Sequence, residues 1–354
     1  MMTLAIEERT MMRIVNLDGA KRVNWYYGGN AGRKICIEMD GSRWMVKFPE
    51  PTAGMRGRVA SYTTSPLSEW LGSHIYESLG IDAHETVLGY CEGKLVCACR
   101  DFAWPDKRLV EFHDMKNSLS DDLPESFENR PSDGRSLVLS DVLSAIDNLA
   151  DDSALVRERF WDMFVVDAFI GNADRNNENW GFLIEPDGAM RLAPVFDNGN
   201  SFFNKRRDSA AIERIDDLSA LKQDAIGGVR SCYLKDDGHP ISPMKFIRSA
   251  ESPECNAALV RFMERLDLDA VESLIESVPE EYLNLTPLPR EVKDFHKEVL
   301  RLRVRECFAP ALEKIREAFS RRSPEESRRR AVDCAKAASE KSGDGGRRPR
   351  GCSL

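Results

Sequence analysis

The chain has 354 residues and a formal net charge of -9, and 42% of its residues are hydrophobic. This length allows one two-lobed domain or two ordinary ones, and the apolar share supports a substantial core. The acidic balance argues against a general nucleic-acid-binding protein, and no apolar run is long enough for a membrane helix. We therefore expect neither specific nucleic-acid binding nor membrane attachment.

The nine cysteines are scattered and form no Cys-x-x-Cys pair. Cys97 and Cys99 alternate within an expected strand, so both side chains point to the same side of it. Near the start of the chain, Glu7, Glu8 and Arg9 interrupt the apolar run, which argues against a secretory segment. The five histidines show no metal-ligand spacing and are interpreted as ordinary residues. A reducing cytoplasm is the location we expect.

A glycine-rich loop lies between two expected strands near the start of the chain. It contains Gly28, Gly29 and Gly32, and it connects the apolar run 23–26 to the alternating segment 34–39. Glycines let backbone N–H groups approach phosphates closely because they carry no Cβ. The strand–loop–strand context is not that of a Walker A loop, which leads into a helix. An ordinary glycine-containing hairpin is the plain alternative.

Lys47 lies on the next expected strand, after a hairpin turn at Asp40-Gly41. Alternation along this strand places Lys47 on the face opposite to Val46 and Phe48. Lys47 would lie under the glycine-rich loop if that loop folds back over the sheet. A solvated strand lysine is the alternative.

The segment 65–80 predicts a helix, with Ser65 as its N-cap, a proline at the first helical position and a glycine at its end. Glu69 lies away from the apolar stripe of this helix. Its carboxylate could form an ion pair with Lys47. Glu77 is the rival partner, and a plain surface position for Glu69 is equally open.

Further elements are expected along the rest of the chain. A hairpin is expected over 85–99, and residues 100–102 follow where a two-lobed enzyme would have its hinge. The polar, turn-rich segment 106–153 is expected to be an insertion between the lobes or a mobile flap. Helices are expected over 256–277 and 290–319, and these would complete the larger lobe.

The polar loop that contains Asp174 and Asn179 is the most informative part of the sequence. It follows a helix expected over 157–170, which ends at Gly171. Two short strands come next, joined by a turn at 186–188. The loop therefore begins where a buried helix ends, so a rigid element holds it in place.

Asp197 follows the second of these strands, so the hairpin brings Asn179 and Asp197 to the same end. An Asp, an Asn five positions later and a second Asp form the set that kinases use for phosphoryl transfer. Asp174 would orient the attacking hydroxyl and accept its proton, and the other two would bind Mg²⁺, which prefers oxygen ligands. A polar loop and an ordinary turn aspartate are the plain alternative.

With these residues in place, the chain resembles the HipA-like serine/threonine kinase family, in particular its short CtkA-type branch. The matching segments are 28–34, 44–49, 65–72, 160–179 and 193–203. The resemblance implies an α+β, two-lobed protein-kinase-like fold, with ATP bound in the cleft between the lobes. The expected organisation is an N-terminal extension (1–22), a β-rich N-lobe (23–102), a mainly helical C-lobe (103–322) and a basic, disordered tail (323–354).

The resemblance also implies the roles of the candidate residues. Asp174 becomes the catalytic base, Asn179 and Asp197 become the Mg²⁺ ligands, and Lys47 becomes the contact to the α- and β-phosphates of ATP. Glu69 and the glycines at 28, 29 and 32 complete the nucleotide site. Transfer to a protein hydroxyl and autophosphorylation are expected, and an antitoxin-like or regulatory partner is left open. Toxin activity is not implied, because an asparagine stands where the toxins carry a histidine, two positions after Asp174.

Two other functions remain open. The first is a small-molecule or lipid-head-group kinase, because phosphoinositide kinases use a similar Asp-Arg-x-x-x-Asn loop. The second is a nucleotide-binding pseudokinase that acts as an interaction module, although the retention of all four charged and polar site residues speaks against it. The end of the chain (320–354) has ten Lys/Arg against five Asp/Glu. A short helix is expected over 325–341, within a tail that we expect to be solvated.

Overall fold

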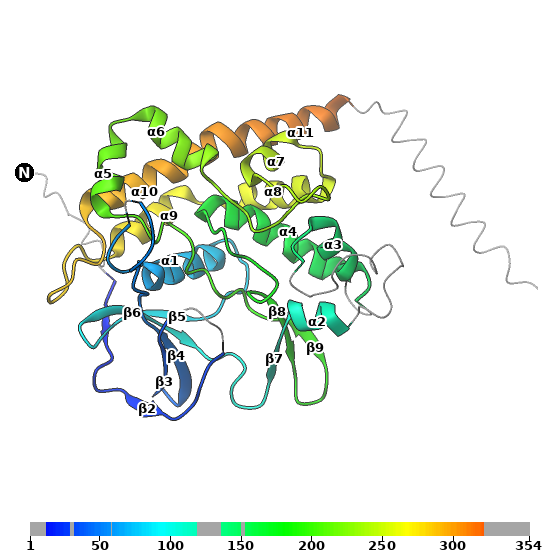
Figure 1. Ribbon diagram of the computed structural model, residues 1–354. Helices are drawn as coiled ribbons and strands as arrows, with labels where there is room; N and C mark the ends of the chain where they lie inside the picture. Colours follow the sequence, from blue (N-terminus) through cyan, green and yellow to red (C-terminus); the bar gives the residue numbers. More distant parts are fainter. Residues whose placement is uncertain (1–11, 29–31, 58, 119–135, 150–152, 322–354) are drawn as a thin grey trace, which may run out of the picture.

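Figure 1 shows the computed structural model, in which a β-rich lobe lies below a larger helical lobe. The structure describes residues 12–28, 32–57, 59–118, 136–149 and 153–321. The glycine-rich loop is therefore described only in part, because Gly29 lies outside these ranges. The tail over 323–354, with the helix expected at 325–341, lies outside them as well.

The N-terminal lobe is built on a six-stranded sheet with the order β1-β5-β6-β4-β3-β2. Its strands are β1 (Val15–Asn16), β2 (Lys21–Val23), β3 (Lys34–Met39), β4 (Ser42–Lys47), β5 (Thr86–Cys91) and β6 (Lys94–Arg100). Neighbouring strands are antiparallel except for β1 and β5, which are parallel. Both β1 and β2 begin before residue 23, within the segment expected as an N-terminal extension.

Two hairpin turns set the register of this sheet. Asp40 and Gly41 have φ values of 51° and 71° between β3 and β4, and Glu92 and Gly93 have values of 49° and 74° between β5 and β6. Turns with positive φ at both central residues match the right-handed twist of the strands that they join. Both predicted hairpins are therefore confirmed. The register places Lys47 at the end of β4, on the face that the alternation predicted.

The first part of the expected strand pattern is wrong. The apolar run 23–26 was expected to be a strand, but β2 ends at Val23. Trp25 and Tyr26 are 48% and 86% exposed, and the guanidinium of Arg43 lies 4.4 Å from the ring centroid of Trp25. Aromatic residues are typical of strands, but here they lie on the surface beyond the edge strand.

The helix α1 (Ser65–Ser78) packs against β5 and β6, between the sheet and the helical lobe (Figure 1). Its buried stripe consists of Leu67, Leu71 and Ile75 and continues to Leu79 beyond the helix end. The N-cap residue is Thr64, one position before the predicted Ser65, and a proline occupies the first turn. The helix therefore begins and ends within a residue or two of its prediction.

A second sheet of three strands lies beside the first, below the helical lobe (Figure 1). Its strands are β7 (Arg108–Glu111), β8 (Gly181–Ile184) and β9 (Met190–Leu192), in the order β7-β8-β9. The segment 106–153, expected to be an insertion or a flap, thus supplies a strand of this sheet, and it also forms α2 (Phe112–Ser118) and α3 (Leu139–Asp147). The sequence did not predict β7 because its partner, β8, lies about seventy residues further along the chain.

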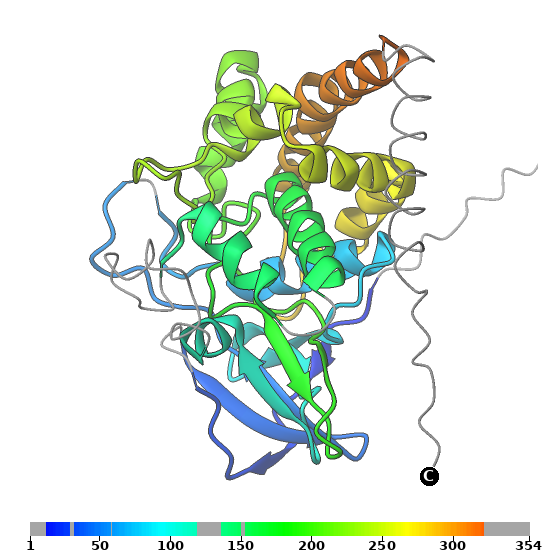
Figure 2. The same cartoon turned by 90° about the vertical axis from the view of Figure 1, so that its right-hand side faces the viewer.

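The helical lobe is built around α4 (Ser153–Ile170). This helix is buried on nearly all sides over its last eleven residues, as expected for a helix that is apolar all round. The surrounding helices are α5 (Asp208–Ile215), α6 (Leu218–Lys222), α7 (Pro243–Ser249), α8 (Pro253–Arg265), α9 (Leu268–Ser277), α10 (Arg290–Arg303) and α11 (Ala309–Arg321). Figure 2 shows them stacked above the two sheets. Within the described ranges, no helix is both long and apolar enough to cross a membrane.

Two expected helices differ in detail from the structure. The segment 256–277 forms two helices rather than one, because Asp267 leaves the helical conformation and accepts a hydrogen bond from the N–H of Ala270, which caps α9. The segment 290–319 forms one continuous helical run, in which a π-helical turn over Val304–Phe308 joins α10 to α11.

Candidate active site

Lys47 lies at the centre of the site, between carboxylates that come from different parts of the chain. Its Nζ lies 3.0 Å from Oε2 of Glu69 on α1 and 2.8 Å from Oδ1 of Asp197, which follows β9. The ion pair expected between Lys47 and Glu69 is therefore present, and the rival Glu77 is exposed on α1. The side chain of Glu69 is 1% exposed, whereas that of Asp197 is 40% exposed and accessible to a ligand.

Lys47 and the carboxylates around it stabilise one another in their charged forms. Burial acts to lower the pKa of the Lys47 ammonium, but the charges of Asp197 and Glu69 hold that pKa well above its ordinary value. Burial acts to raise the pKa of Glu69, but Lys47 and His84 hold it below its ordinary value. Lys47 is thus a cation and Glu69 an anion throughout the neutral range.

Glu69 is held from three sides. Its Oε1 accepts a hydrogen bond of 3.1 Å from the backbone N–H of Asn198 and lies 2.9 Å from Nε2 of His84, while its Oε2 faces Lys47. His84 is itself fixed, because its backbone N–H donates to the backbone oxygen of Val195. The interpretation of His84 as an ordinary histidine missed this contact. No local signal could have found it, since three distant segments create it.

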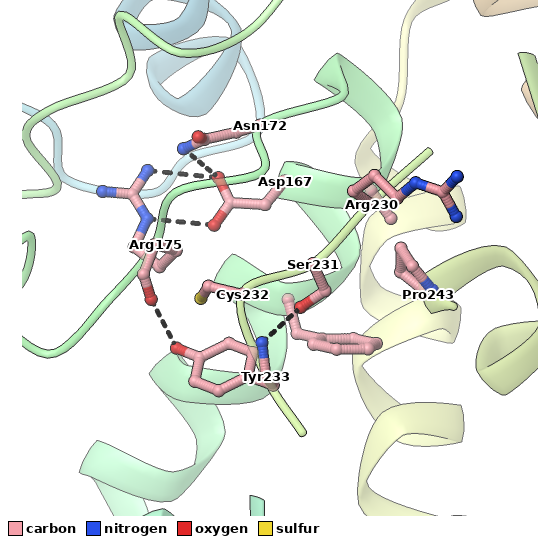
Figure 3. Close-up of a pocket in the computed structure, with 10 residues that line it drawn as sticks. Asp167, Asn172, Arg175, Arg230, Ser231, Cys232, Tyr233 and Pro243 are labelled. Atoms are coloured by element: carbon pink, nitrogen blue, oxygen red, sulfur yellow. Dashed lines mark hydrogen bonds and ion pairs between the residues drawn. The ribbon is translucent and has the colours of Figure 1, made fainter. Parts of the chain in front are cut away.

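Arg175 joins the loop that contains Asp174 and Asn179 to the segment around Asp197. Its Nε lies 2.9 Å from Oδ2 of Asp167 on α4, and Figure 3 shows this paired contact. The same guanidinium donates to the backbone oxygens of Asn179 and Phe196 and to Oδ1 of Asn198. Because the side chain is only 2% exposed, these contacts hold the two loops together in a dry environment. The sequence contained the Asp-Arg pair, but only the fold shows what the arginine does.

Asp167 accepts hydrogen bonds from other residues besides Arg175. Its Oδ1 accepts hydrogen bonds from Nδ2 of Asn172 at 3.1 Å and from Oη of Tyr76 on α1 at 2.8 Å. On the other side, Oη of Tyr233 donates to the backbone oxygen of Arg175 at 2.8 Å (Figure 3). Buried carboxylates are stable when they are paired and fully hydrogen-bonded, as this one is. Asp167 therefore connects α1 and α4 to the loop that contains Asp174.

Asp174 is exposed on its loop. The loop is shaped by its own side chains: the backbone N–H of Asp174 donates to Oδ1 of Asn172, and Nδ2 of Asn179 donates to the backbone oxygen of Asp174 at 2.6 Å. One oxygen of the Asp174 carboxylate accepts a hydrogen bond from Nδ2 of Asn176. An exposed carboxylate on a loop held by Arg175 can reach a hydroxyl that enters from solvent.

The described parts of the glycine-rich loop lie next to Lys47. Lys34 is the direct cross-strand partner of Lys47, so both side chains lie on one face of the sheet. Nζ of Lys34 donates to the backbone oxygen of Gly28 at 2.8 Å, which holds the start of the loop over this face. Gly32 has a φ of 62°, and a Cβ there would lie 3.0 Å from Cγ of Glu50, so a larger residue would be strained.

Asn179 and Asp197 each have an oxygen atom of the kind that binds Mg²⁺. Asn179 uses its amide nitrogen within the loop, so its carbonyl oxygen is the atom left for a cation. Asp197 has a φ of 62° and directs Oδ1 at Lys47, which leaves Oδ2 for a cation. Carboxylate and amide oxygens are the ligands that Mg²⁺ prefers, and this pair offers no nitrogen or sulfur.

The chain is similar in sequence and in structure to kinases of one family. Residues 23–237 match the HipA-like C-terminal domain. The serine/threonine-protein kinase CtkA of Helicobacter pylori (strain J99) is 34% identical over 259 residues, which are 72% of this chain and 75% of that protein. The crystal structure of a Helicobacter pylori proinflammatory kinase CtkA matches with a TM-score of 0.77 and 28% identity, over 86% of this chain and 99% of that chain.

A more distant solved structure shares the fold alone. It is HipA of Shewanella oneidensis MR-1 in complex with HipB and its operator DNA, with a TM-score of 0.51 and 14% identity, over 88% of this chain and 71% of that chain. From these similarities, the chain belongs to the HipA-like family. It is a serine/threonine protein kinase with the two-lobed α+β fold that the resemblance implied.

Proposed function

We propose that this kinase transfers the γ-phosphate of ATP to hydroxyl groups of protein substrates and requires Mg²⁺. The observation that carries the proposal is the position of Lys47 between Glu69 and Asp197. A fixed cation can bind the phosphates of a nucleotide, and an accessible carboxylate beside it can bind the metal ion. Mg·ATP would supply the transferable phosphoryl group and the charge neutralisation that transfer requires.

Each predicted residue has one role in this proposal. Asp174 orients the attacking hydroxyl and accepts its proton. Asn179 and Asp197 hold Mg²⁺ through their oxygens. Lys47 contacts the α- and β-phosphates, and Glu69 holds the Lys47 ammonium in place.

The glycines at 28, 29 and 32 cover the phosphates in the same proposal. Their backbone N–H groups would approach the phosphate oxygens without steric conflict. We assign the glycine-rich loop, Lys47 and α1 to an N-lobe that extends from β1 to residue 102, so it begins before the expected boundary at residue 23, and the catalytic residues to a C-lobe at 103–322.

The proposal includes autophosphorylation in the loop that connects β4 to α1. This loop lies against the segment that follows Asp197, since the backbone N–H of Thr64 donates to the backbone oxygen of Asn204. Thr52 and Thr63 are buried, whereas Ser61 is exposed, so Ser61 is the acceptor that we assign within this loop. Mass spectrometry after incubation with Mg·ATP tests this. Phosphate at Ser61 would support it, and phosphate only within 320–354 would contradict it.

Incubation of the purified protein with labelled ATP and Mg²⁺, alone and with a cell lysate, tests the main proposal. We expect label on protein and none with the variant Asp174→Ala. Label that appears only in small molecules would indicate a small-molecule or lipid-head-group kinase. Absence of transfer under every condition would contradict the proposal.

Two further points belong to the proposal. We assign the enzyme to the cytoplasm, because the described cysteines are free thiols, as is usual in a reducing compartment. We also infer a regulatory protein partner by analogy with the HipA–HipB complex alone. Size measurement of the kinase purified from its native cells tests the second point, and a free monomer there would contradict it.

A further inference from the structure

A buried cluster of three potential metal ligands lies next to the Lys47–Glu69 ion pair. It consists of Glu69 on α1, His84 just before β5 and Cys99 on β6, which are 1%, 2% and 1% exposed. One carboxylate oxygen, one imidazole nitrogen and the sulfur all lie within 4.8 Å of one another. The three side chains come from three separate elements, so the tertiary fold alone creates this cluster.

A second thiol lies at the same place. The Sγ atoms of Cys97 and Cys99 are 3.9 Å apart. Cys97 is the cross-strand partner of Lys47, and Cys99 is the partner of Met45, so both thiols lie on the face of the sheet that carries Lys47. The cluster itself offers three ligands without including Asn179 or Asp197, and Cys97 lies beside Cys99 at its edge.

The ligand types differ from those of the proposed magnesium site. Thiolate and imidazole ligands, supplemented by one carboxylate, are typical of Zn²⁺ and related ions in tetrahedral sites. Mg²⁺ is a hard cation that avoids sulfur. Two chemically distinct cations could thus bind on either side of Lys47.

The imidazole of His84 provides an independent indication of a ligand. Its Nε2 is buried and lies 2.9 Å from Oε1 of Glu69, yet among the described residues it makes no aligned hydrogen bond. A buried polar atom without an aligned hydrogen bond is costly and needs an explanation. A metal ion between Nε2 of His84, the Glu69 carboxylate and the Cys99 sulfur would satisfy all three groups.

The charges of the cluster also suit a divalent cation. A thiolate at Cys99 and the carboxylate of Glu69 together balance a divalent ion. Lys47 would not be left unpaired, because its second partner, Asp197, lies 2.8 Å away.

We propose that Glu69, His84 and Cys99 form an inhibitory site for Zn²⁺ or a similar thiophilic divalent ion, with the fourth position open to water. Binding forms bonds from the metal to sulfur, nitrogen and oxygen, and the protons on Sγ of Cys99 and on Nε2 of His84 leave to solvent. The ion takes Glu69 from Lys47, so the lysine ammonium moves toward Asp197 and away from its position for the phosphates. The inhibitory part of this inference rests on the proposed function of Lys47, whereas the binding part does not.

Spectroscopy with Co²⁺ tests binding without any measurement of activity. We expect the purified chain to give the near-ultraviolet thiolate–Co²⁺ band and the visible bands of a tetrahedral site, both removed by added Zn²⁺. Cys99→Ala and His84→Ala should each weaken Co²⁺ binding at least about tenfold. The matched control is Cys91→Ala, a buried thiol at the opposite end of the same hairpin, which should bind as the wild type does. A wild type without the thiolate band, or a Cys99→Ala variant with an unchanged one, would overturn the proposal.

A second measurement separates inhibition from binding. Phosphoryl transfer is followed at saturating Mg²⁺ and ATP while a chelating buffer sets the free Zn²⁺ concentration. We expect Zn²⁺ to inhibit the wild type and Cys91→Ala equally, and Cys99→Ala to need at least about tenfold more Zn²⁺. Co²⁺ binding together with equal inhibition of all three proteins would overturn the inhibitory role. If no protein transfers phosphate, the proposed function fails, while the Co²⁺ spectra still decide whether the metal site exists.

Discussion

Gly72 on α1 packs directly against Asn198, so closely that a Cβ at Gly72 would lie 2.6 Å from Cβ of Asn198. This approach lets Nδ2 of Asn198 donate to Oγ of Ser73 at 3.1 Å and lets its backbone N–H reach Glu69. The helix that carries Glu69 is thereby attached to the residue that follows Asp197. The position of the central ion pair therefore depends on the absence of a side chain at one glycine.

Gly72→Ala should separate α1 from the Asp197 segment. The added methyl group has no space, so we expect a loss of about 1–3 kcal/mol in the free energy of unfolding. We also expect a fall in phosphoryl transfer, because Glu69 moves with the helix. Denaturant unfolding and a transfer assay check both results. Gly19→Ala is the control, since nothing lies within 4 Å of its Cβ position. Wild-type behaviour of Gly72→Ala would contradict this account.

Lys47→Ala should reduce phosphoryl transfer by at least about a hundredfold, because a positioned cation next to the phosphates is lost. Glu69→Ala should reduce it less, through loss of the lysine's orientation. The double variant should be no worse than Lys47→Ala alone, since residues in contact are not additive. Glu77→Ala, on the exposed face of the same helix, should have no effect. Strictly additive losses in rate would mean that Glu69 acts independently of Lys47.

Asp174→Ala and Asp197→Ala should differ in their effect on nucleotide binding. The first should abolish transfer and leave the affinity for Mg·ATP nearly intact, because the base acts on the attacking hydroxyl. The second should weaken that affinity as well, since it removes a proposed ligand of the metal ion. Calorimetric titration with Mg·ATP measures the difference. An equal loss of affinity in both variants would show that the two roles are assigned wrongly.

Arg175→Lys should destabilise the protein although the charge is kept. A lysine ammonium cannot reproduce the planar fork that reaches Asp167, Asn198 and two backbone oxygens at once. We expect a loss of about 1–3 kcal/mol in the free energy of unfolding from the buried groups left without partners. The matched control is Arg191→Lys on the exposed strand β9, for which a change within about 0.5 kcal/mol is expected. An equal change in the free energy of unfolding for the two variants would show that Arg175 does not hold the two loops together.

Asp224 should contribute stability that depends on pH. Its carboxylate lies 2.6 Å from Arg206 and also pairs with Arg214. Burial acts to raise the pKa of Asp224, but the hydrogen bonds from the two arginines hold it below its ordinary value. A lowered carboxyl pKa stabilises the fold above the unfolded pKa of about 3.9, and this stabilisation is lost as the pH falls through the folded pKa.

Asp224→Asn should therefore lower the free energy of unfolding by about 1–3 kcal/mol at pH 7. The difference from the wild type should shrink as the pH falls below about 4, where Asp224 of the unfolded chain takes up its proton, and should vanish below the lower pKa of the folded state. Urea unfolding across this pH range measures it. Asp187→Asn, in the exposed turn before β9, should show no such dependence. A constant difference at every pH would show that the charge of Asp224 is not the cause.

The elements formed by local patterns were predicted well. The hairpin at Asp40-Gly41, the apolar stripe of α1 and the end of α4 at Gly171 each depend on residues close together in the chain. Positive φ at a glycine and apolar spacing act within one turn or one helix, so their effect can be read without the fold. The spacing of Asp174, Asn179 and Asp197 likewise lies within one loop and one hairpin.

The elements that depend on distant partners were not predicted. β7 forms only because β8 supplies its hydrogen-bond partners, and the strand expected over 23–26 stops at Val23 because residues 24–26 pair with no strand. Strand formation depends on pairing across the sheet more than on the residues of one strand. The choice between Glu69 and Glu77 was open for a similar reason, because the sequence does not reveal which face of α1 meets Lys47.

The sequence by itself determined the chemistry that this chain offers: the lysine on a strand, the glutamate on a helix, and the two aspartates and the asparagine at kinase spacing. The tertiary structure alone decided which of these side chains meet. It placed Lys47 between Glu69 and Asp197, put Arg175 on Asp167, and buried His84 and Cys99 beside Glu69. The reason is physical: these contacts join segments far apart in the chain, so the packing of both sheets against α1 and α4 creates them and no local pattern encodes them.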